Sequence, residues 1–284
     1  MEGLKNTLEY LLTPSAPIFI VGALIVLLVP ILVHFFVVRT TPYTTLPTIL
    51  LVGPSGAGKT SLLTLVERGD KTVPTHTSQT PQPVELTVSA GGAVQSFRET
   101  AKEDAPGMHK KFLLMDTPGH GKLRKFAMDR VNTQDSLKGI MFVLDAAALD
   151  ENLPATGSYL YDVLLALQKR MGAGKTSRGP SSIHVLIAAN KSDLFTALPV
   201  SLVKSNLEAE LGRIRKSKSK GLLDSGVGAD DVGNEESDNW LGTYGAEKFS
   251  FSQMREFDLE VDIVGGSVLE GKVDKWWKWI SARV

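Results

Sequence analysis

The stretch GPSGAGKT, residues 53–60, decides the fold of this chain. It fits the pattern G-x-x-x-x-G-K-[ST], in which a glycine-rich loop curls its backbone N–H groups around a di- or triphosphate. The apolar run TILLVG before it and the run TSLLTLV at its end predict a strand, a loop and then a helix. A plain glycine-rich turn is the alternative, but it does not require this context. The stretch therefore predicts a phosphate-binding loop.

Each part of the loop has an expected task. Lys59 should neutralise β- and γ-phosphate oxygens, and Thr60 should place its hydroxyl on Mg²⁺. The helix that begins at Lys59 also directs its amino-terminal dipole at the phosphates. The expected nucleotide-binding positions here are Gly53, Ser55, Gly56, Ala57, Gly58, Lys59, Thr60 and Ser61.

A second polar motif, DTPGH, follows the apolar run KFLLMD. Asp116 at a strand end can hold Mg²⁺, mostly through water. Gly119 offers a backbone N–H to a γ-phosphate and permits a sharp change of chain direction. By itself the motif is also a common turn sequence, so its weight comes from its place at the next strong strand.

A third motif, NKSD, comprises Asn190, Lys191, Ser192 and Asp193 and follows the run SIHVLIAAN. The Asp193 carboxylate can accept two hydrogen bonds from a guanine edge, and adenine lacks both donors. A site of this kind rejects the wrong base strongly because its buried acceptor would be left unpaired. The motif alone could be a solvated turn. The three motifs in this order predict a guanine nucleotide site.

Apolar runs alternate with helical patterns beyond residue 47, which predicts an α/β fold with a mostly parallel central sheet and helices on both faces. Ligands of such sheets bind at the carboxyl ends of the strands, where the three motifs lie. The expected strands are 48–53, 84–90, 111–116, 139–146, 182–190 and 261–264, and the expected helices are 59–68, 158–171, 197–216 and 272–284. In the last helix, one face with Val273, Trp277, Ile280 and Val284 should pack on the sheet, with Trp276 beside them and Trp279 off that face.

Residues 18–38 (IFIVGALIVLLVPILVHFFVV) carry no charged side chain and are long enough for a transmembrane helix. The alternatives are a buried core helix and a cleaved signal peptide, but the run is long for a signal peptide and its preceding residues are net acidic. Arg39 after the run favours a cytosolic carboxyl side. We expect a short luminal segment at 1–17, a linker at 39–47 and one domain at 48–284. Its inserts, near 91–108 and 217–245, should be mobile.

The order GPSGAGKT, DTPGH, NKSD resembles that of small GTPases of the Ras/Arf superfamily. It is most similar to the family of signal recognition particle receptor beta subunits, in which a membrane anchor precedes the GTPase domain. The stretches DTPGHGKLR and GGSVLEGKVDKWWKWI carry the same resemblance.

The resemblance implies GTP and Mg²⁺ as cofactors and the receptor's alpha subunit as partner in a heterodimer. It further implies a single-pass protein of the endoplasmic reticulum membrane with a cytosolic P-loop GTPase domain, acting in cotranslational protein targeting. The ribosome and the translocon are further candidate partners.

The resemblance also implies roles for residues outside the three motifs. Within residues 72–81, Thr75 corresponds to the threonine that reaches Mg²⁺ and the γ-phosphate, with Thr77 as its rival. Ser267 falls in a weak fifth motif that backs the guanine, although an ordinary turn would read the same. His120 replaces the glutamine that orients water in many relatives, so it is a candidate catalytic residue beside Gly119. We expect slow hydrolysis that depends on a partner.

Composition narrows the remaining classes of function. The 284 residues carry 31 basic and 31 acidic side chains, which argues against direct sequence-specific binding of nucleic acid. The chain has no cysteine, which excludes disulfide frameworks and a thiol nucleophile. Two alternatives remain: a constitutively GTP-loaded scaffold without significant hydrolysis, and a vesicle-trafficking GTPase of Arf or Sar type.

Overall fold

The computed structural model describes residues 16–40, 46–68, 74–88, 94–96, 110–173, 182–224 and 240–284. The chain divides into two compact units, Met1–Thr45 and Leu46–Val284. Residues 1–15 of the predicted segment 1–17, most of the linker and most of both predicted inserts lie outside the described residues.

The described residues of the first unit form the helix α2 (Ala16–Thr40), with Pro30 inside it. The prediction of a helix over residues 18–38 is therefore confirmed, and the helix also takes in the first two residues of the predicted linker. Among the helices in the described part of the chain, none satisfies the criteria of length and apolarity for a bilayer span.

The second unit is built on a seven-stranded sheet with the order β3-β2-β4-β1-β5-β6-β7. Five neighbouring strands run parallel: β4 (Lys110–Asp116), β1 (Thr48–Val52), β5 (Leu137–Asp145), β6 (Ile183–Asn190) and β7 (Leu259–Gly265). At one edge, β2 (Gln82–Val88) pairs antiparallel with β4, and β3 (Val94–Ser96) pairs antiparallel with β2. The predicted α/β class with a mostly parallel sheet is confirmed.

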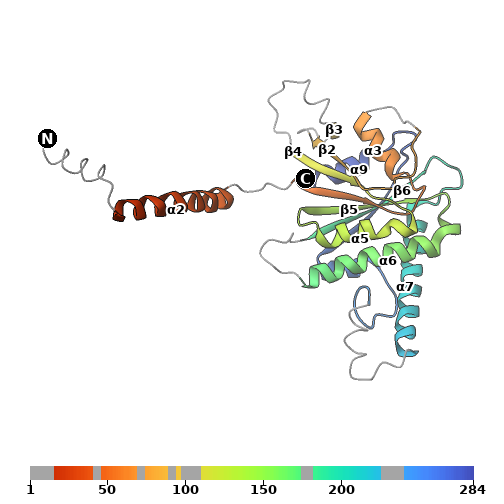
Figure 1. Ribbon diagram of the computed structural model, residues 1–284. Helices are drawn as coiled ribbons and strands as arrows, with labels where there is room; N and C mark the ends of the chain where they lie inside the picture. The colour runs from red at the N-terminus through yellow and green to blue at the C-terminus, as the bar shows by residue number, and fades with distance from the viewer. Residues whose placement is uncertain are drawn as a thin grey trace. The chain divides into compact units, whose positions relative to one another are not determined.

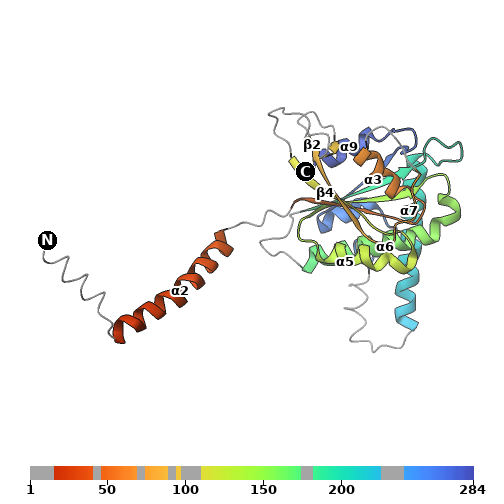
Figure 2. The same cartoon turned by 45° about the horizontal axis from the view of Figure 1, so that its top comes forward.

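Helices cover both faces of this sheet (Figures 1 and 2). One face carries α3 (Lys59–Arg68) and α9 (Asp274–Ser281), and the other carries α5 (Arg124–Thr133), α6 (Leu149–Ala173) and α7 (Val200–Asp224). Successive residues of β1 alternate between the two cores, so Ile49 and Leu51 pack under α3 whereas Leu50 and Val52 pack under α6. Burial on both faces explains why these strands read as unbroken apolar runs.

Two helices are longer than their periodicity predicts. Helix α6 begins at Leu149 rather than 158, because Asp145 accepts hydrogen bonds from the N–H groups just before the helix and acidic residues occupy its first turn. Helix α7 continues to Asp224, into the predicted mobile insert, where Lys218 pairs with Asp162 of α6 at 3.0 Å. The insert predicted at 91–108 contains strand β3.

The predicted packing face of the last helix is confirmed for Val273 and Ile280, which are buried, and is wrong for Trp279. Trp276 and Trp279 are buried, whereas Trp277 is only partly covered. Each buried indole N–H has an acceptor on β7: Trp276 donates to the Val264 carbonyl at 3.1 Å and Trp279 donates to Asp262 at 3.0 Å. These acceptors set the rotation of the helix, since a buried indole N–H needs a partner.

Candidate functional site

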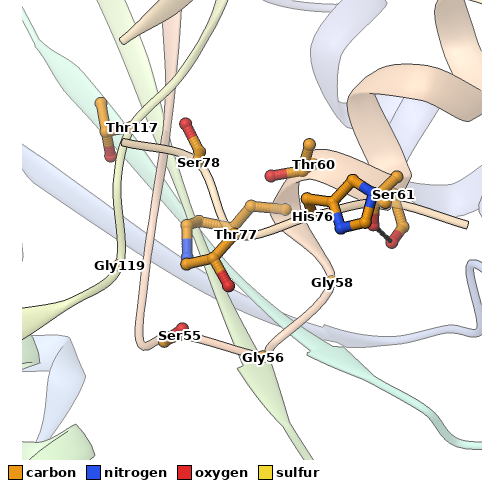
Figure 3. A pocket seen from close by; sticks show the side chains of 12 residues that line it. Ser55, Gly56, Gly58, Thr60, Ser61, His76, Thr77, Ser78, Thr117 and Gly119 are labelled. Carbon is orange, nitrogen blue, oxygen red and sulfur yellow. Dashed lines mark hydrogen bonds between the residues drawn. The ribbon is translucent and has the colours of Figure 1, made fainter. Parts of the chain in front are cut away.

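The three motifs meet at the carboxyl edge of the parallel strands. Because β1, β4 and β6 run in the same direction, their final residues open onto the same side of the sheet. Two adjoining hollows lie there, and they share Gly56, Gly58, Ser61 and Thr75. Polar side chains of the loop and of residues 75–78 surround the first hollow (Figure 3). The second hollow measures about 460 Å³ and is lined by Asn190, Lys191 and Asp193 and by the turn after β7.

The phosphate loop depends on glycine at particular points. Gly53, Gly56 and Gly58 have φ angles of 142°, 79° and 99°, which side chains rarely allow. A Cβ atom on Gly53 would lie 2.0 Å from the carbonyl oxygen of Val143, and one on Gly58 would lie 2.2 Å from the amide nitrogen of Asn190. The loop therefore curls tightly, with main chain and amide groups packed against it.

Lys59 places a buried cation within this curl. Its Nζ donates to the carbonyl oxygens of Gly53 and Pro54, both at 2.8 Å. Burial lowers the pKa of Lys59 to about 8, and the charge of Arg124 adds to this effect while Asp116 opposes it. Gly119 packs so close that a Cβ there would lie 2.5 Å from Nζ. The DTPGH motif thus meets the phosphate loop at the cation.

Asp116 and Thr60 form the polar pair expected of a magnesium site. The Thr60 hydroxyl donates to Oδ2 of Asp116 at 2.7 Å. Asp116 is fully buried, its Oδ1 has no hydrogen-bond partner among the described residues, and burial raises its pKa. Mg²⁺ takes oxygen ligands and uses one or two carboxylates with substrate phosphates and water. The pair fits that ion: an unpartnered carboxylate oxygen stands beside a hydroxyl.

The two candidate switch threonines have different surroundings. The Thr75 hydroxyl lies 3.0 Å from the Ser61 hydroxyl, and Thr75 lines both hollows. Thr77 is exposed and lines the first hollow. In this conformation Thr75 contacts the start of α3, next to the magnesium pair.

The base side is tied to the phosphate side through Asn190. Its Nδ2 donates to the carbonyl oxygen of Ala57 at 2.8 Å, and its Oδ1 accepts from the N–H of Val268 at 3.0 Å. The Ser267 hydroxyl donates to Oδ1 of Asp193 at 2.5 Å. The structure therefore brings the NKSD residues, the predicted fifth motif and the phosphate loop into one constellation.

With this geometry established, comparison with known proteins decides the family. The family model for the signal recognition particle receptor beta subunit matches residues 44–257. The chain belongs to this family. The beta subunit of Saccharomyces cerevisiae is 32% identical over 243 residues, which cover 84% of this chain and 84% of that protein. The human beta subunit is 34% identical over 163 residues, which cover 57% of this chain and 52% of the human protein.

Solved structures of the receptor beta family share the fold. The SRb-GTP/SRX complex from Chaetomium thermophilum has a TM-score of 0.67 and 42% identity, covering 84% of this chain and 100% of that chain. The SRb-GDP-Mg structure from the same organism has a TM-score of 0.64 and 44% identity, covering 86% of this chain and 100% of that chain. The mammalian receptor structure has a TM-score of 0.60 and 26% identity, covering 84% of this chain and 100% of that chain.

His120, the candidate catalytic residue of this receptor beta chain, is exposed. Its Nδ1 accepts a hydrogen bond from the N–H of Lys122 at 3.3 Å and caps the short helix η1 (Gly121–Leu123). Its neighbour Gly119 lines the first hollow. The observed contact of His120 is thus a helix cap, and its part in hydrolysis stays a prediction.

Sequence reasoning missed two groups near the site. Asp145, the last residue of β5, places Oδ2 2.5 Å from the ammonium of Lys191. Its only sequence signal is an aspartate that ends the apolar run GIMFVLD. Arg124 at the start of α5 stacks its guanidinium over the Tyr159 ring at 4.3 Å and acts on Lys59 through its charge. It ends the stretch DTPGHGKLR, which gives no sign of its effect on Lys59.

Proposed function

We propose that this chain is a GTP-binding switch, the beta subunit of a signal recognition particle receptor, which holds the alpha subunit at the endoplasmic reticulum for cotranslational targeting. Membership of the family supports this function. The solved relatives that carry GTP or GDP with Mg support the cofactors, and the mammalian receptor structure supports the partnership.

One observation supports this function most strongly. The buried cation Lys59, the Thr60–Asp116 pair that suits Mg²⁺ and the carboxylate that could bind a guanine base all lie around two adjoining hollows. Lys59 would hold the β- and γ-phosphates, and Thr60 with Asp116 would hold Mg²⁺, joined by Thr75 in the GTP state. When bound, the ion neutralises phosphate charge. Asp193 would accept from the guanine edge, backed by Ser267. The first hollow would thus hold the phosphates and Mg²⁺, and the adjoining second hollow would hold the base.

The switch would lie in Gly119 and Thr75. Both line the first hollow, and Gly119 packs directly on Lys59, so a γ-phosphate there would tie both segments to the loop. Loss of that phosphate would release them and alter the surface offered to the alpha subunit. Hydrolysis would be slow without a partner, since Nδ1 of His120 accepts from the N–H of Lys122 as a helix cap and is not free to orient water.

A constitutive scaffold that keeps GTP permanently is the second candidate, and the capping role of His120 favours it. A single-turnover assay of GTP loss, with and without the alpha subunit, separates the two candidates. No loss under either condition would overturn the switch and support the scaffold. An Arf or Sar type is disfavoured by the family match.

The amino-terminal segment would anchor the domain. The length of residues 18–38 and their lack of charged side chains support a single span, and Arg39 after them supports a cytosolic GTPase domain. Contacts with the ribosome or the translocon would follow from that location. Alkaline extraction of microsomes tests the anchor: the chain should stay in the membrane, and release into the supernatant would contradict the proposal.

Nucleotide binding by the full chain in detergent tests the site. The wild-type protein should bind GTP in preference to ATP, and Lys59→Ala should lose nucleotide binding because it removes the buried cation. Lys125→Ala, which removes an exposed cation of α5, is the matched control and should bind as wild type does. Wild-type affinity in the Lys59 variant, or equal binding of ATP, would overturn the assignment.

A further inference from the structure

Lys191 holds a backbone conformation that is unusual for a lysine. Its φ is 63°, in the left-handed region that glycine, asparagine and aspartate adopt most readily. Such a conformation persists only where the surroundings impose it. Glycine would adopt this conformation without strain, whereas Lys191 is held in it by its contacts.

The surroundings of Lys191 fix its main chain from both sides. Asn190 accepts through its carbonyl from the N–H of Ala146 at 3.0 Å, and Ser192 donates to the carbonyl of Gly266 at 3.1 Å. Leu194 closes the turn by donating to the Lys191 carbonyl at 3.1 Å. The backbone at 191 is therefore held between the β5–α6 loop and the turn after β7.

Asp145 adds the contact that uses the side chain. It is the residue directly opposite Asn190 in the β5–β6 register. Its Oδ2 lies 2.5 Å from Nζ of Lys191, while its Oδ1 accepts from the N–H groups of Ala147 and Ala148 at 3.0 and 3.3 Å. One carboxylate thus fixes both its own loop and the lysine. Charge-assisted hydrogen bonds of this kind are the short and strong ones.

The stem of Lys191 then has a defined place. Lys191 lines the second hollow together with Asn190 and Asp193. Because its ammonium pairs with Asp145, at the carboxyl end of β5, the aliphatic part of the side chain is free to form a wall of that hollow. An apolar wall beside a hydrogen-bonding carboxylate suits a flat heteroaromatic base.

We propose that Asp145 is a positioning residue for base recognition, which anchors the ammonium of Lys191 so that the lysine stem and Asp193 keep the geometry that a guanine base requires. The inference rests on the proposed function and extends it to a residue outside all of the motifs. Asp145 acts through Lys191 and contacts no nucleotide itself.

A purely local role for Asp145 is the alternative, because it also caps the loop before α6. Asp145→Asn separates the two roles: the amide keeps an oxygen for the N–H groups of Ala147 and Ala148 but loses the charge that holds Lys191. Asp162→Asn is the matched control, since it removes the carboxylate of another lysine pair, Asp162 on α6 with Lys218 on α7 at 3.0 Å, away from both hollows.

The experiment measures dissociation constants of GDP, GTP and inosine diphosphate for the full chain in detergent. Asp145→Asn should weaken GDP and GTP by the same factor, about tenfold, because the base is shared and the phosphate contacts are untouched. It should also narrow the preference for GDP over inosine diphosphate, which lacks the 2-amino group that Asp193 reads. Asp162→Asn should leave all three constants unchanged.

A double-mutant cycle with Lys191→Met tests whether Asp145 acts through the lysine. The methionine keeps an apolar stem without the ammonium, so Asp145→Asn should add nothing in that background. Lys191→Met alone gives the same test if Asp145→Asn fails to fold, since Lys191 is partly exposed and its removal should weaken GDP and GTP equally.

The outcomes are separable. Wild-type constants in Asp145→Asn or in Lys191→Met, or full additivity of the two changes, would overturn the positioning role and leave the proposed function standing. A wild-type chain that binds neither GDP nor GTP would overturn the proposed function and this inference with it.

Discussion

Proton uptake on nucleotide binding reports directly on the buried state of Lys59. The side chain is 5% exposed, and burial lowers its pKa to about 8 from an ordinary 10.5. At pH 8 about half of the nucleotide-free molecules therefore carry a neutral Lys59. A triphosphate beside the amine favours its charged form. Binding of GTP at pH 8 should consequently take up about half a proton, against about a tenth at pH 7.

The sign of the pH dependence follows from the same shift. Affinity for GTP should be highest below pH 8, where Lys59 is already charged, and should fall as pH rises through 8. The loss between pH 7 and pH 9 should be about tenfold, because the charged fraction of the free protein falls by that factor. Guanine nucleotide binding at alkaline pH thus reports the cost of charging a buried amine.

Calorimetry in two buffers of different ionisation enthalpy measures the uptake. The apparent binding enthalpies should diverge at pH 8 and nearly coincide at pH 7. Lys125→Ala should reproduce the wild-type difference, since that side chain is exposed. Equal uptake at both pH values, or none at pH 8, would show that Lys59 is not the buried titrating group described above.

Four further variants probe other contacts. In nucleotide-free wild type, the free energy of unfolding measured in urea should rise by about 2 kcal/mol from pH 7.5 to 9.5, because the cost of a charged buried Lys59 disappears as pH rises. Lys59→Met should abolish this rise. Asp193→Asn should shift the preference from GTP toward XTP in competition binding, since the acceptor becomes partly a donor; retention of a strong GTP preference would mean that Asp193 does not read the base. Gly119→Ala should weaken GTP more than GDP, as measured by their dissociation constants, because its Cβ would lie 2.7 Å from the Gly53 carbonyl oxygen. Arg215→Met should lower the free energy of unfolding by about 2 kcal/mol, measured in urea, because two carbonyl oxygens that the buried guanidinium bonds would lose their donor; an unchanged midpoint would contradict this.

The motifs made much of this site predictable from sequence. A phosphate loop must follow a buried strand and open a helix, so the bounds of α3 follow from Lys59 onward and agree with the structure. The polar residues after β4 and β6 must share an edge with it once the strands are parallel. The convergence of Asp116 and Asn190 on the loop needs no further information.

The missed features depend on neighbours that are distant in sequence. Asp145 gains its meaning only when β5 pairs with β6 and places it opposite Asn190. Likewise, the helical pattern alone could not choose between Trp277 and Trp279 for burial, because the acceptor on Asp262 lies on another element. The antiparallel direction of β2 depends on how the chain connects it to its neighbours, and the alternation of apolar residues does not encode that connection.

Asn190 has a consequence for how a nucleotide could leave. Its amide joins the carbonyl of Ala57, in the phosphate loop, to the N–H of Val268, in the turn after the last strand. The two ends of the nucleotide pocket are therefore mechanically joined by one side chain. An exchange partner that pulled the Val268 turn outward would therefore also strain the contact to Ala57, and would loosen the phosphate loop without touching it.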